Sequence, residues 1–232
     1  NVNLKRVKCL KVLGVLIDEE LNFVSHCKSI AKKCHNALWS LAPLKKVLNI
    51  YNKKIVVEAL IKSIYSYACP VWLIGSRNIL CVNRIIRACA RFIYDKSKYE
   101  SISDNINVDL QWLTAENTGK SEICKLVYKI QNRMGPTYFN NYVNLEISGS
   151  MNTRNNQYLH SAAVYNSKLG EKSFKCRASK VWLSLPVSIT SSISTNGFNV
   201  FKRQLKVYFN ELQCIDRMKQ IFELLDEYEL SN

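Results

Sequence analysis

The sequence predicts a mainly α protein: a helical bundle with a small N-terminal β-hairpin and a long C-terminal helix. Two observations support this prediction. Only 7 glycines and 4 prolines occur among 232 residues, which disfavours a turn-rich all-β fold and favours long helices. Over most of the chain, apolar residues also recur every three or four positions, which is the period of an amphipathic helix.

The first 41 residues change from a strand pattern to a helix pattern. The stretch 7–17 is rich in β-branched and apolar residues, which indicates a strand or a β-hairpin. The acidic triplet at 18–20 follows as a turn or helix start. Apolar residues then recur at helical spacing over 24–41, which predicts an amphipathic helix with Ser25 as its N-cap.

Two further helices are predicted before residue 100. The helix at 49–68 is apolar on most of its surface, so we expect it in the core. Its narrow polar strip of Lys54, Glu58 and Lys62 has the spacing of ion pairs, and a proline two residues later is expected to end it. The helix at 77–94 has one apolar face and a separate stripe of three arginines.

The rest of the chain is expected to be helical with polar loops. Helices are predicted at 116–133, 172–185 and 197–228, and loops near 147–157 and 188–196. We therefore divide the chain into residues 1–98, a hairpin plus helical bundle, and residues 99–232, a downstream helical region. Charged residues at 58 and 62 and a proline at 70 interrupt the longest apolar stretch, so no membrane span is expected.

The charge of the chain points to a polyanionic partner. The formal net charge is +15 and the sequence pI is about 9.4, while 47% of the residues are hydrophobic. This hydrophobic fraction excludes a disordered chain, and the basic balance favours nucleic acid. Most of the surplus lies before residue 99, where 18 basic residues face 5 acidic ones, a difference of +13.

Basic side chains on the predicted hairpin and helices are the candidate contacts to a nucleic-acid backbone, because cations neutralise phosphates whatever the base sequence. The candidates are Lys8, Lys11, Lys28, Lys32, Lys33, Lys53, Lys54, Arg84, Arg87 and Arg91. The two tryptophans among them, Trp39 and Trp72, are expected in the core rather than as stacking platforms for bases.

No pattern in the sequence indicates a self-sufficient active site. Phosphate-binding glycine loops, zinc-protease helices and nucleophile elbows are all absent from the sequence. Cys27 and Cys34 would lie about 10 Å apart along a helix, too far to share a metal ion, so we expect packing and no metal site. The nine cysteines, with no C-x-x-C pair, indicate reduced thiols in an intracellular protein of the cytoplasm or nucleus.

Several short motifs follow one another in a fixed order along the chain. The first are Leu13-Gly14-Val15-Leu16-Ile17-Asp18 and Val24-Ser25-His26, followed by Tyr65-Ser66-Tyr67-Ala68-Cys69-Pro70-Val71-Trp72 and the helix Arg84-Ile85-Ile86-Arg87-Ala88. Later matches are Thr153-Arg154, Trp182-Leu183-Ser184-Leu185-Pro186 and Phe201-Lys202-Arg203-Gln204-Leu205-Lys206. Together these motifs span residues 10 to about 210. In this order they resemble the reverse transcriptases of non-LTR (LINE-like) retrotransposons, in the region C-terminal to the palm.

The resemblance implies that Leu13, Gly14 and Val15 correspond to the primer grip and the helices over 22–94 to the thumb. The catalytic Tyr/Phe-x-Asp-Asp motif of the family lies upstream of this region, and no Asp-Asp dipeptide occurs here. We therefore expect no polymerase activity and no cofactor in this chain, since the Mg²⁺ of the parent enzyme belongs to the palm. The expected partners are RNA or an RNA–DNA duplex, together with the palm and fingers.

Two alternatives remain open from the sequence alone. The chain could be a protein–protein scaffold that self-associates through an apolar seam on its last helix, formed by Phe201, Leu205, Tyr208, Leu212 and Ile215. The same seam also fits docking of the helix on the core of its own chain. The sequence is also compatible with a decayed element that has no selected function.

Overall fold

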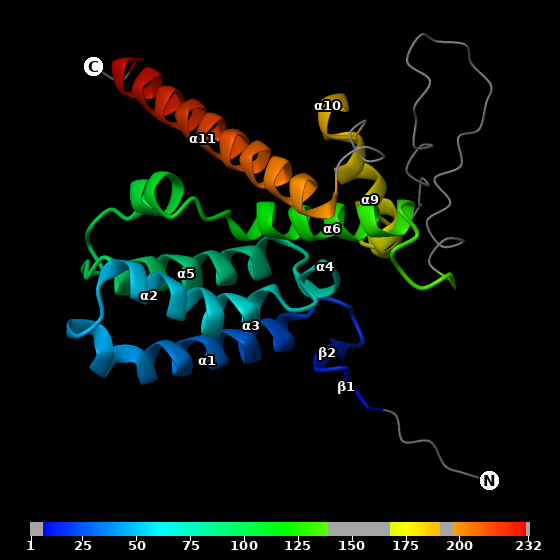
Figure 1. The fold of residues 1–232 in the computed structure, drawn as a ribbon, viewed down its shortest axis with the longest axis horizontal. Helices are drawn as coiled ribbons and strands as arrows, with labels where there is room; N and C mark the ends of the chain where they lie inside the picture. The colour runs from blue at the N-terminus through cyan, green and yellow to red at the C-terminus, as the bar shows by residue number, and fades with distance from the viewer. Residues whose placement is uncertain (1–6, 139–167, 191–196, 231–232) are drawn as a thin grey trace. The chain divides into compact units, whose positions relative to one another are not determined.

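The computed structural model describes residues 7–138, 168–190 and 197–230, without the side chains of 168–169, 220–222 and 224–230. It confirms a mainly α fold with an N-terminal hairpin and a long C-terminal helix (Figure 1). The chain forms two compact units: 1–119 together with 209–232, and 120–208. This division differs from the expected boundary at residue 98. The loop beyond that residue forms hydrogen bonds and an ion pair with the last helix, and these contacts lie within the first unit.

The N-terminal hairpin forms as predicted. Strands β1 (Cys9–Val12) and β2 (Val15–Asp18) pair antiparallel, with Val12 opposite Val15. The two-residue turn therefore consists of Leu13 and Gly14, which have φ angles of 46° and 87°. Positive φ at both central positions is the geometry that matches the twist of a hairpin, and glycine adopts it without steric cost.

Helix α1 (Val24–Leu41) begins one residue before Ser25, so the predicted N-cap is wrong. The carboxylate of Asp18 accepts hydrogen bonds from the backbone N–H groups of Asn22, at 3.0 Å, and Phe23, at 2.7 Å. The Asn22 side chain accepts another from the N–H of Val24 at 3.0 Å. The acidic triplet thus acts as the expected helix start, because its first member satisfies donors that a helix leaves free.

The predicted helix at 49–68 consists of α2 (Ile50–Val57), a π-helical segment (Glu58–Lys62) and α3 (Ser63–Ser66). A 3-10 turn (Ala42–Lys46) precedes it, and the side chain of Asn49 caps its first turn by accepting from the N–H of residue 52 at 2.8 Å.

Two expectations for this helix are wrong. One side of it is open, because Ile50, Tyr51, Ile55 and Leu60 are about half or more exposed. The helix also ends before Pro70, which lies instead in the first turn of a separate short helix, α4 (Cys69–Trp72). Proline is tolerated there, since the first turn has no backbone acceptor for its missing N–H.

The polar strip of the same helix has partners outside the helix. The indole N–H of Trp112 donates to the carboxylate of Glu58 at 2.6 Å, and the Lys62 ammonium lies 5.9 Å from the Trp112 ring centroid. These contacts join the π-helical segment to the loop 54 residues later. The spacing of Glu58 and Lys62 therefore reflects a tertiary contact as well as helix periodicity.

Helix α5 (Ser76–Ile93) carries a buried asparagine that connects three segments. Asn78 is 1% exposed, and its amide nitrogen lies 2.9 to 3.1 Å from the carbonyl oxygens of Asn22, Trp72 and Ile74. These carbonyls belong to the segment before α1 and to the end of α4. One side chain thus holds the starts of α1 and α5 against α4.

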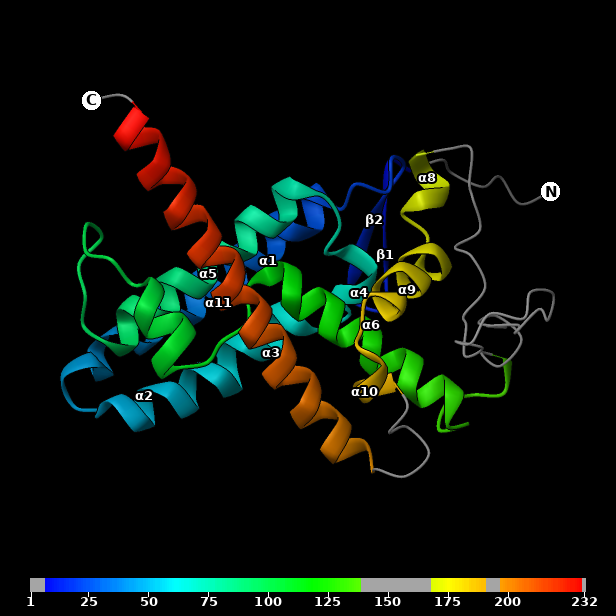
Figure 2. The same ribbon diagram turned by 90° about the horizontal axis from the view of Figure 1, so that it is seen from above.

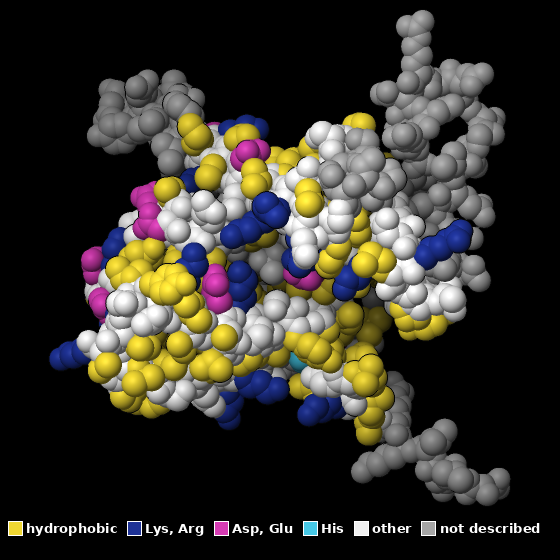
Figure 3. Space-filling model, viewed as in Figure 1, with side chains coloured by type: hydrophobic (Ala, Val, Ile, Leu, Met, Phe, Trp, Pro, Cys, Tyr) yellow, Lys and Arg dark blue, Asp and Glu magenta, His cyan; other side chains and the backbone are white. Residues whose placement is uncertain are grey.

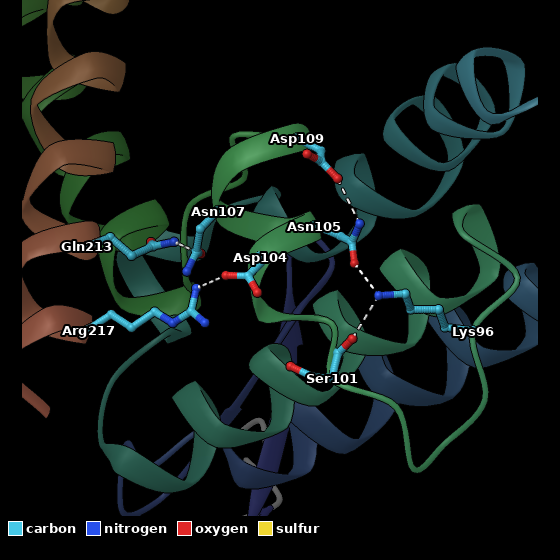
Figure 4. Close-up of polar contacts among 8 residues, drawn as sticks. All are labelled: Lys96, Ser101, Asp104, Asn105, Asn107, Asp109, Gln213 and Arg217. Carbon is cyan, nitrogen blue, oxygen red and sulfur yellow. Dashed lines mark hydrogen bonds and ion pairs between the residues drawn. The ribbon is translucent and has the colours of Figure 1, made fainter. Parts of the chain in front are cut away.

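The loop after α5 is held by a polar network that reaches the last helix, α11 (Phe198–Leu230) (Figure 4). The Lys96 ammonium donates to Asn105 at 2.7 Å, at the start of a π-helical segment, Asn105–Asp109. On the other side, the buried amide of Gln213 donates to Asn107 and to the carbonyl of Trp112. This network explains why the first unit includes residues 209–232.

The second unit contains the later part of α6 (Ala115–Gln131), the short helices α8 (Lys168–Glu171) and α10 (Val187–Thr190), α9 (Phe174–Leu183), and the start of α11. Its core includes Tyr128, Trp182 and Phe201, and the Tyr128 and Phe201 rings stack with centroids 4.4 Å apart. The predicted loop at 147–157 lies outside the described residues. The predicted loop near 188–196 begins within α10, and its remainder, from 191, is also outside them.

The proposed self-association seam is not an open surface. Phe201 is 1% exposed and Leu205 is 0% exposed, so both are core residues, whereas Ile215 is 48% exposed. The alternative that the helix docks on its own chain is the one that these burial values match. Among the residues that the structure describes, no helix is both long enough and apolar enough to cross a membrane.

Stability is expected to fall as the pH drops below about 6.5, because His26 is buried in its neutral form. The Nδ1 atom accepts a hydrogen bond from the N–H of Leu16 in the hairpin at 3.3 Å, while Nε2 is buried without a partner. Burial, and then the charge of Lys33, lowers the pKa of His26 below its ordinary value of 6.5. The unfolded chain therefore takes up a proton at a higher pH than the folded protein.

Urea unfolding at several pH values measures this effect. The contribution of His26 is fully present above pH 6.5 and is lost between that pH and the lower pKa of the folded state, by about 1.4 kcal/mol per unit of difference. The variant His26→Gln should remove this part of the pH dependence, whereas His35→Gln, at an exposed position on the same helix, should retain it. Equal pH profiles for the wild type and His26→Gln would contradict the assignment.

Candidate nucleic-acid interface

The outward face of α1 carries two lysines and a histidine in a row that ends in an aromatic side chain. Ile30 and the residues one turn away on either side are buried, which fixes the core-facing side of the helix. Lys28, Lys32, His35 and Trp39 follow one another at spacings of four, three and four residues. They therefore share the opposite side, where all four are exposed. We call these four side chains the lysine row.

Trp39 is the largest departure from the sequence-based expectation. Its side chain is 81% exposed, whereas Trp72, for which the same core position was expected, is 0% exposed. Leu41 occupies the inward position near the end of α1, so the tryptophan two residues earlier is left on the outside. Proteins that bind single-stranded nucleic acids combine aromatic side chains, on which bases stack, with basic side chains that contact the backbone. An exposed indole beside lysines is such a combination.

A second row lies on α5. Arg84 and Arg87 are exposed as predicted, and Arg77, which was not among the predicted contacts, extends the same face by two turns. Val82 and Ile86, on the other side of the helix, are buried in the core. We call Arg77, Arg84 and Arg87 the arginine row.

The two rows belong to helices that pack directly on each other. The Cys27 thiol of α1 lies 3.8 Å from the carbonyl oxygen of Asn78 at the start of α5, and the two helices run side by side (Figures 1 and 2). Figure 3 shows Lys and Arg side chains along the lower edge of this face, beside α1 and the hairpin. The structure thus places cations on adjacent elements of one unit.

Four other predicted contacts remain accessible to different degrees. Lys8 is exposed before β1 and Lys11 on that strand, and Lys33 is exposed on α1 next to the lysine row. Lys54 on α2 is half-buried. The hairpin and α1 therefore contribute most of the accessible lysines among the predicted contacts.

Two of the residues predicted to contact nucleic acid, Lys53 and Arg91, have hydrogen-bond partners within the protein. Lys53 is 2% exposed and its ammonium donates to the Asp95 carboxylate at 2.7 Å, so it does not lie on an open surface. Arg91 is half-buried, and its guanidinium Nε donates to the carbonyl of Ser97 at 3.0 Å. Both side chains hold the end of α5 in place, which local sequence spacing did not indicate.

The tip of the hairpin is exposed and anchored from one side. Leu13 is 86% exposed, while Val15 is buried at 6% exposure. The Tyr67 hydroxyl donates to the carbonyl of Leu13 at 2.9 Å, and the Tyr67 ring lies 3.6 Å from the place where a Cβ on Gly14 would stand. The residues that resemble a primer grip therefore form a fixed, projecting turn.

The cysteines act as packing groups where they are buried. All nine are free thiols, and burial raises the pKa of Cys27 and of Cys34 to about 12, so both stay protonated near neutral pH. A protonated thiol is a poor metal ligand, since metals bind the thiolate. Within the described residues, no group of three or more His, Cys, Asp or Glu side chains is placed to hold a metal ion.

One signal in the sequence could have revealed the missed member of the arginine row. Arg77 stands seven residues before Arg84, two helical turns away on the same face. The exposure of Trp39 has no comparable signal, because a helical apolar stripe alone does not tell which residue near its end is left outside the core.

Comparisons of the chain with protein-family models, with curated proteins and with solved structures find no match.

Proposed function

We propose that the first unit binds the sugar–phosphate backbone of RNA or of an RNA–DNA duplex, as the thumb-containing part of a retrotransposon RNA-directed DNA polymerase. The observation that carries this proposal is the pair of exposed rows on adjacent helices, one of them ending in an exposed tryptophan. The family assignment itself rests on the order of the sequence motifs. In this proposal the chain holds the strand, and the polymerase palm of the parent enzyme performs the metal-dependent chemistry.

The electrostatics of the rows favour an external polyanion. In the described parts of the chain, no carboxylate lies within ion-pair distance of Lys28, Lys32, Arg77, Arg84 or Arg87, whereas Lys45, Lys53 and Arg217 have acidic partners. Exposed cations without acidic partners attract phosphates and release condensed counterions when a strand binds. Contacts of this kind position a backbone without selecting bases, which suits a protein that must move along its template.

The expected result is RNA binding that weakens steeply as salt increases. Fluorescence anisotropy with a single-stranded RNA and with an RNA–DNA duplex, at several salt concentrations, gives the slope of log affinity against log salt. Charge reversal in the double variant Arg84→Glu/Arg87→Glu should reduce the magnitude of that slope by about two, because each phosphate that is no longer neutralised lowers it by about one. The lysine-row variant Lys28→Glu/Lys32→Glu should have a similar effect.

The matched control is Lys175→Glu/Lys180→Glu, which makes the same charge change at two exposed positions of α9 in the second unit. It should leave the slope close to that of the wild type. Trp39→Ala should weaken single-strand binding by about 1–3 kcal/mol and keep the slope, because stacking carries no net charge. Salt-independent binding, or an equal effect of the control and the row variants, would contradict the proposal.

A further inference from the structure

A cavity of about 370 Å³ opens beside the start of α2, and none of its lining residues belongs to the two rows. Lys45 and Lys46 of the 3-10 turn, Leu48, Lys53 of α2 and Asp95 after α5 line it. Three ammonium groups and one carboxylate give this lining a formal charge of +2. A volume of this size lies at the lower end of the range for small-molecule sites.

Lys53 is the unusual member of this group. Its side chain is 2% exposed, yet the residue lines the cavity, and its ammonium contacts one carboxylate, that of Asp95, at 2.7 Å. An ammonium has three N–H donors, and Asp95 takes one of them. A buried charge costs free energy unless it is well paired, so an additional oxygen ligand in the cavity would be favourable.

Asp95 is held in place for this contact by the backbone. It follows the last turn of α5 with a φ angle of 56°, a left-handed conformation that is uncommon in residues other than glycine, asparagine, aspartate and histidine. Its carboxylate lies 2.7 Å from the Lys53 ammonium and 3.6 Å from that of Lys45, and its side chain is 54% exposed. The carboxylate thus connects the two lysines, while Lys46 remains exposed at the same cavity.

We propose that this cavity binds a phosphate monoester dianion, the group found at the 5′ end of a nucleic-acid strand. A monoester phosphate carries about −1.5 to −2 charge near neutral pH and offers three strong acceptor oxygens, which matches the net positive lining. A backbone phosphate has a single charge and fits this lining less well. Leu48 supplies an apolar wall beside the lysines for the attached nucleoside. The assignment of the phosphate to the end of a nucleic-acid strand rests on the proposed function. The assignment of the ligand as a phosphate monoester rests on the cavity alone.

The test measures three ligands separately with the whole chain. Inorganic phosphate, titrated calorimetrically at constant ionic strength, tests the site itself. Two RNA oligonucleotides of one sequence, with a 5′-phosphate or a 5′-hydroxyl, test the source. We expect phosphate binding, and about tenfold tighter binding of the 5′-phosphorylated strand, a factor typical of one strong charged contact.

Variants assign the effect to the cavity. Lys53→Met should abolish phosphate binding, and Lys46→Gln should weaken it about threefold to tenfold, the effect of removing one charge-assisted hydrogen bond. Asp95→Asn should instead tighten it, because the lining loses its one carboxylate and its formal charge rises from +2 to +3, while asparagine tolerates the positive φ. Since this variant gains affinity, a folding defect cannot mimic its expected result. Lys98→Gln, at an exposed residue outside the cavity lining, is the matched control and should bind like the wild type.

The outcomes distinguish this inference from the proposed function. No phosphate binding, or Asp95→Asn and Lys98→Gln behaving alike, would overturn the phosphate site even if the 5′-hydroxyl strand binds with a steep salt slope. Phosphate binding without any preference for the 5′-phosphorylated strand would overturn the assignment to a strand end. Phosphate binding by a protein that binds neither RNA strand would support the phosphate site and contradict the proposed function.

Discussion

Replacing Asn78 by aspartate is expected to lower the free energy of unfolding by about 3–5 kcal/mol, the cost of leaving a buried charge uncompensated. The Nδ2 atom of this side chain lies within hydrogen-bond distance of the carbonyl oxygens of Asn22, Trp72 and Ile74, and the residue is 1% exposed. A carboxylate offers these acceptors no donor, so all three carbonyls would be left without this partner while a negative charge stayed buried among them. The variant can relieve this only by binding a proton.

Urea unfolding followed by circular dichroism measures the destabilisation, and a matched variant controls for the chemical change. Asn83→Asp makes the same substitution on α5, but the Asn83 side chain accepts a hydrogen bond from the N–H of Ala115 at 2.9 Å, at the start of α6. A carboxylate can still accept that bond and is favoured near a helix N-terminus, so the expected cost is below about 1 kcal/mol.

The pH dependence gives the variant a second signature. Protonation of the new carboxyl at low pH restores a donor, so the difference between Asn78→Asp and the wild type should shrink as the pH falls. Equal destabilisation by Asn78→Asp and Asn83→Asp would show that the hydrogen bonds of Asn78 do not carry the stability assigned to them.

Truncating Phe201 to alanine is expected to destabilise the second unit by about 3–5 kcal/mol, the range for removing a buried aromatic ring. The ring is 1% exposed, stacks on Tyr128 at 4.4 Å between centroids and lies 6.1 Å from Trp182. Its removal leaves a cavity beside two other large rings, and such a cluster can collapse only in part. The near-UV circular dichroism of these aromatic side chains and the urea midpoint report the change.

The same variant separates core packing from self-association. Val207→Ala, at a position of α11 that is 52% exposed, is the control and should cost little. Sedimentation velocity should give the same molecular mass for the wild type and for both variants. A wild-type dimer that Phe201→Ala converts to a folded monomer would instead support the apolar seam as an interface.

The hairpin and most helices could be predicted from the sequence because their signals are local. The turn at Leu13-Gly14 requires positive φ, and the three- and four-residue spacing of apolar side chains marks the helices whatever they pack against. The lysines of α1 and the exposed arginines of α5 were found in the same way, since spacing along a helix fixes which residues share a face.

The environment of individual side chains could not be predicted in this way. Lys53 has the composition and spacing of a surface cation, but the partner that buries it, Asp95, lies 42 residues later. The predicted core position of Trp39 is wrong for a related reason. In each case the neighbouring helices decide which positions are covered, and the pattern within one helix does not contain that information.

The sequence by itself determined the mainly α fold, the hairpin, the positions of the principal helices and the basic character of the first hundred residues, because each depends on short-range spacing and composition. Only the tertiary structure decided which cations stay exposed in rows, which one is enclosed with a carboxylate in a cavity, and which asparagine connects three segments. These outcomes depend on contacts between residues far apart in the chain, where burial and charge pairing set the free energy of each side chain.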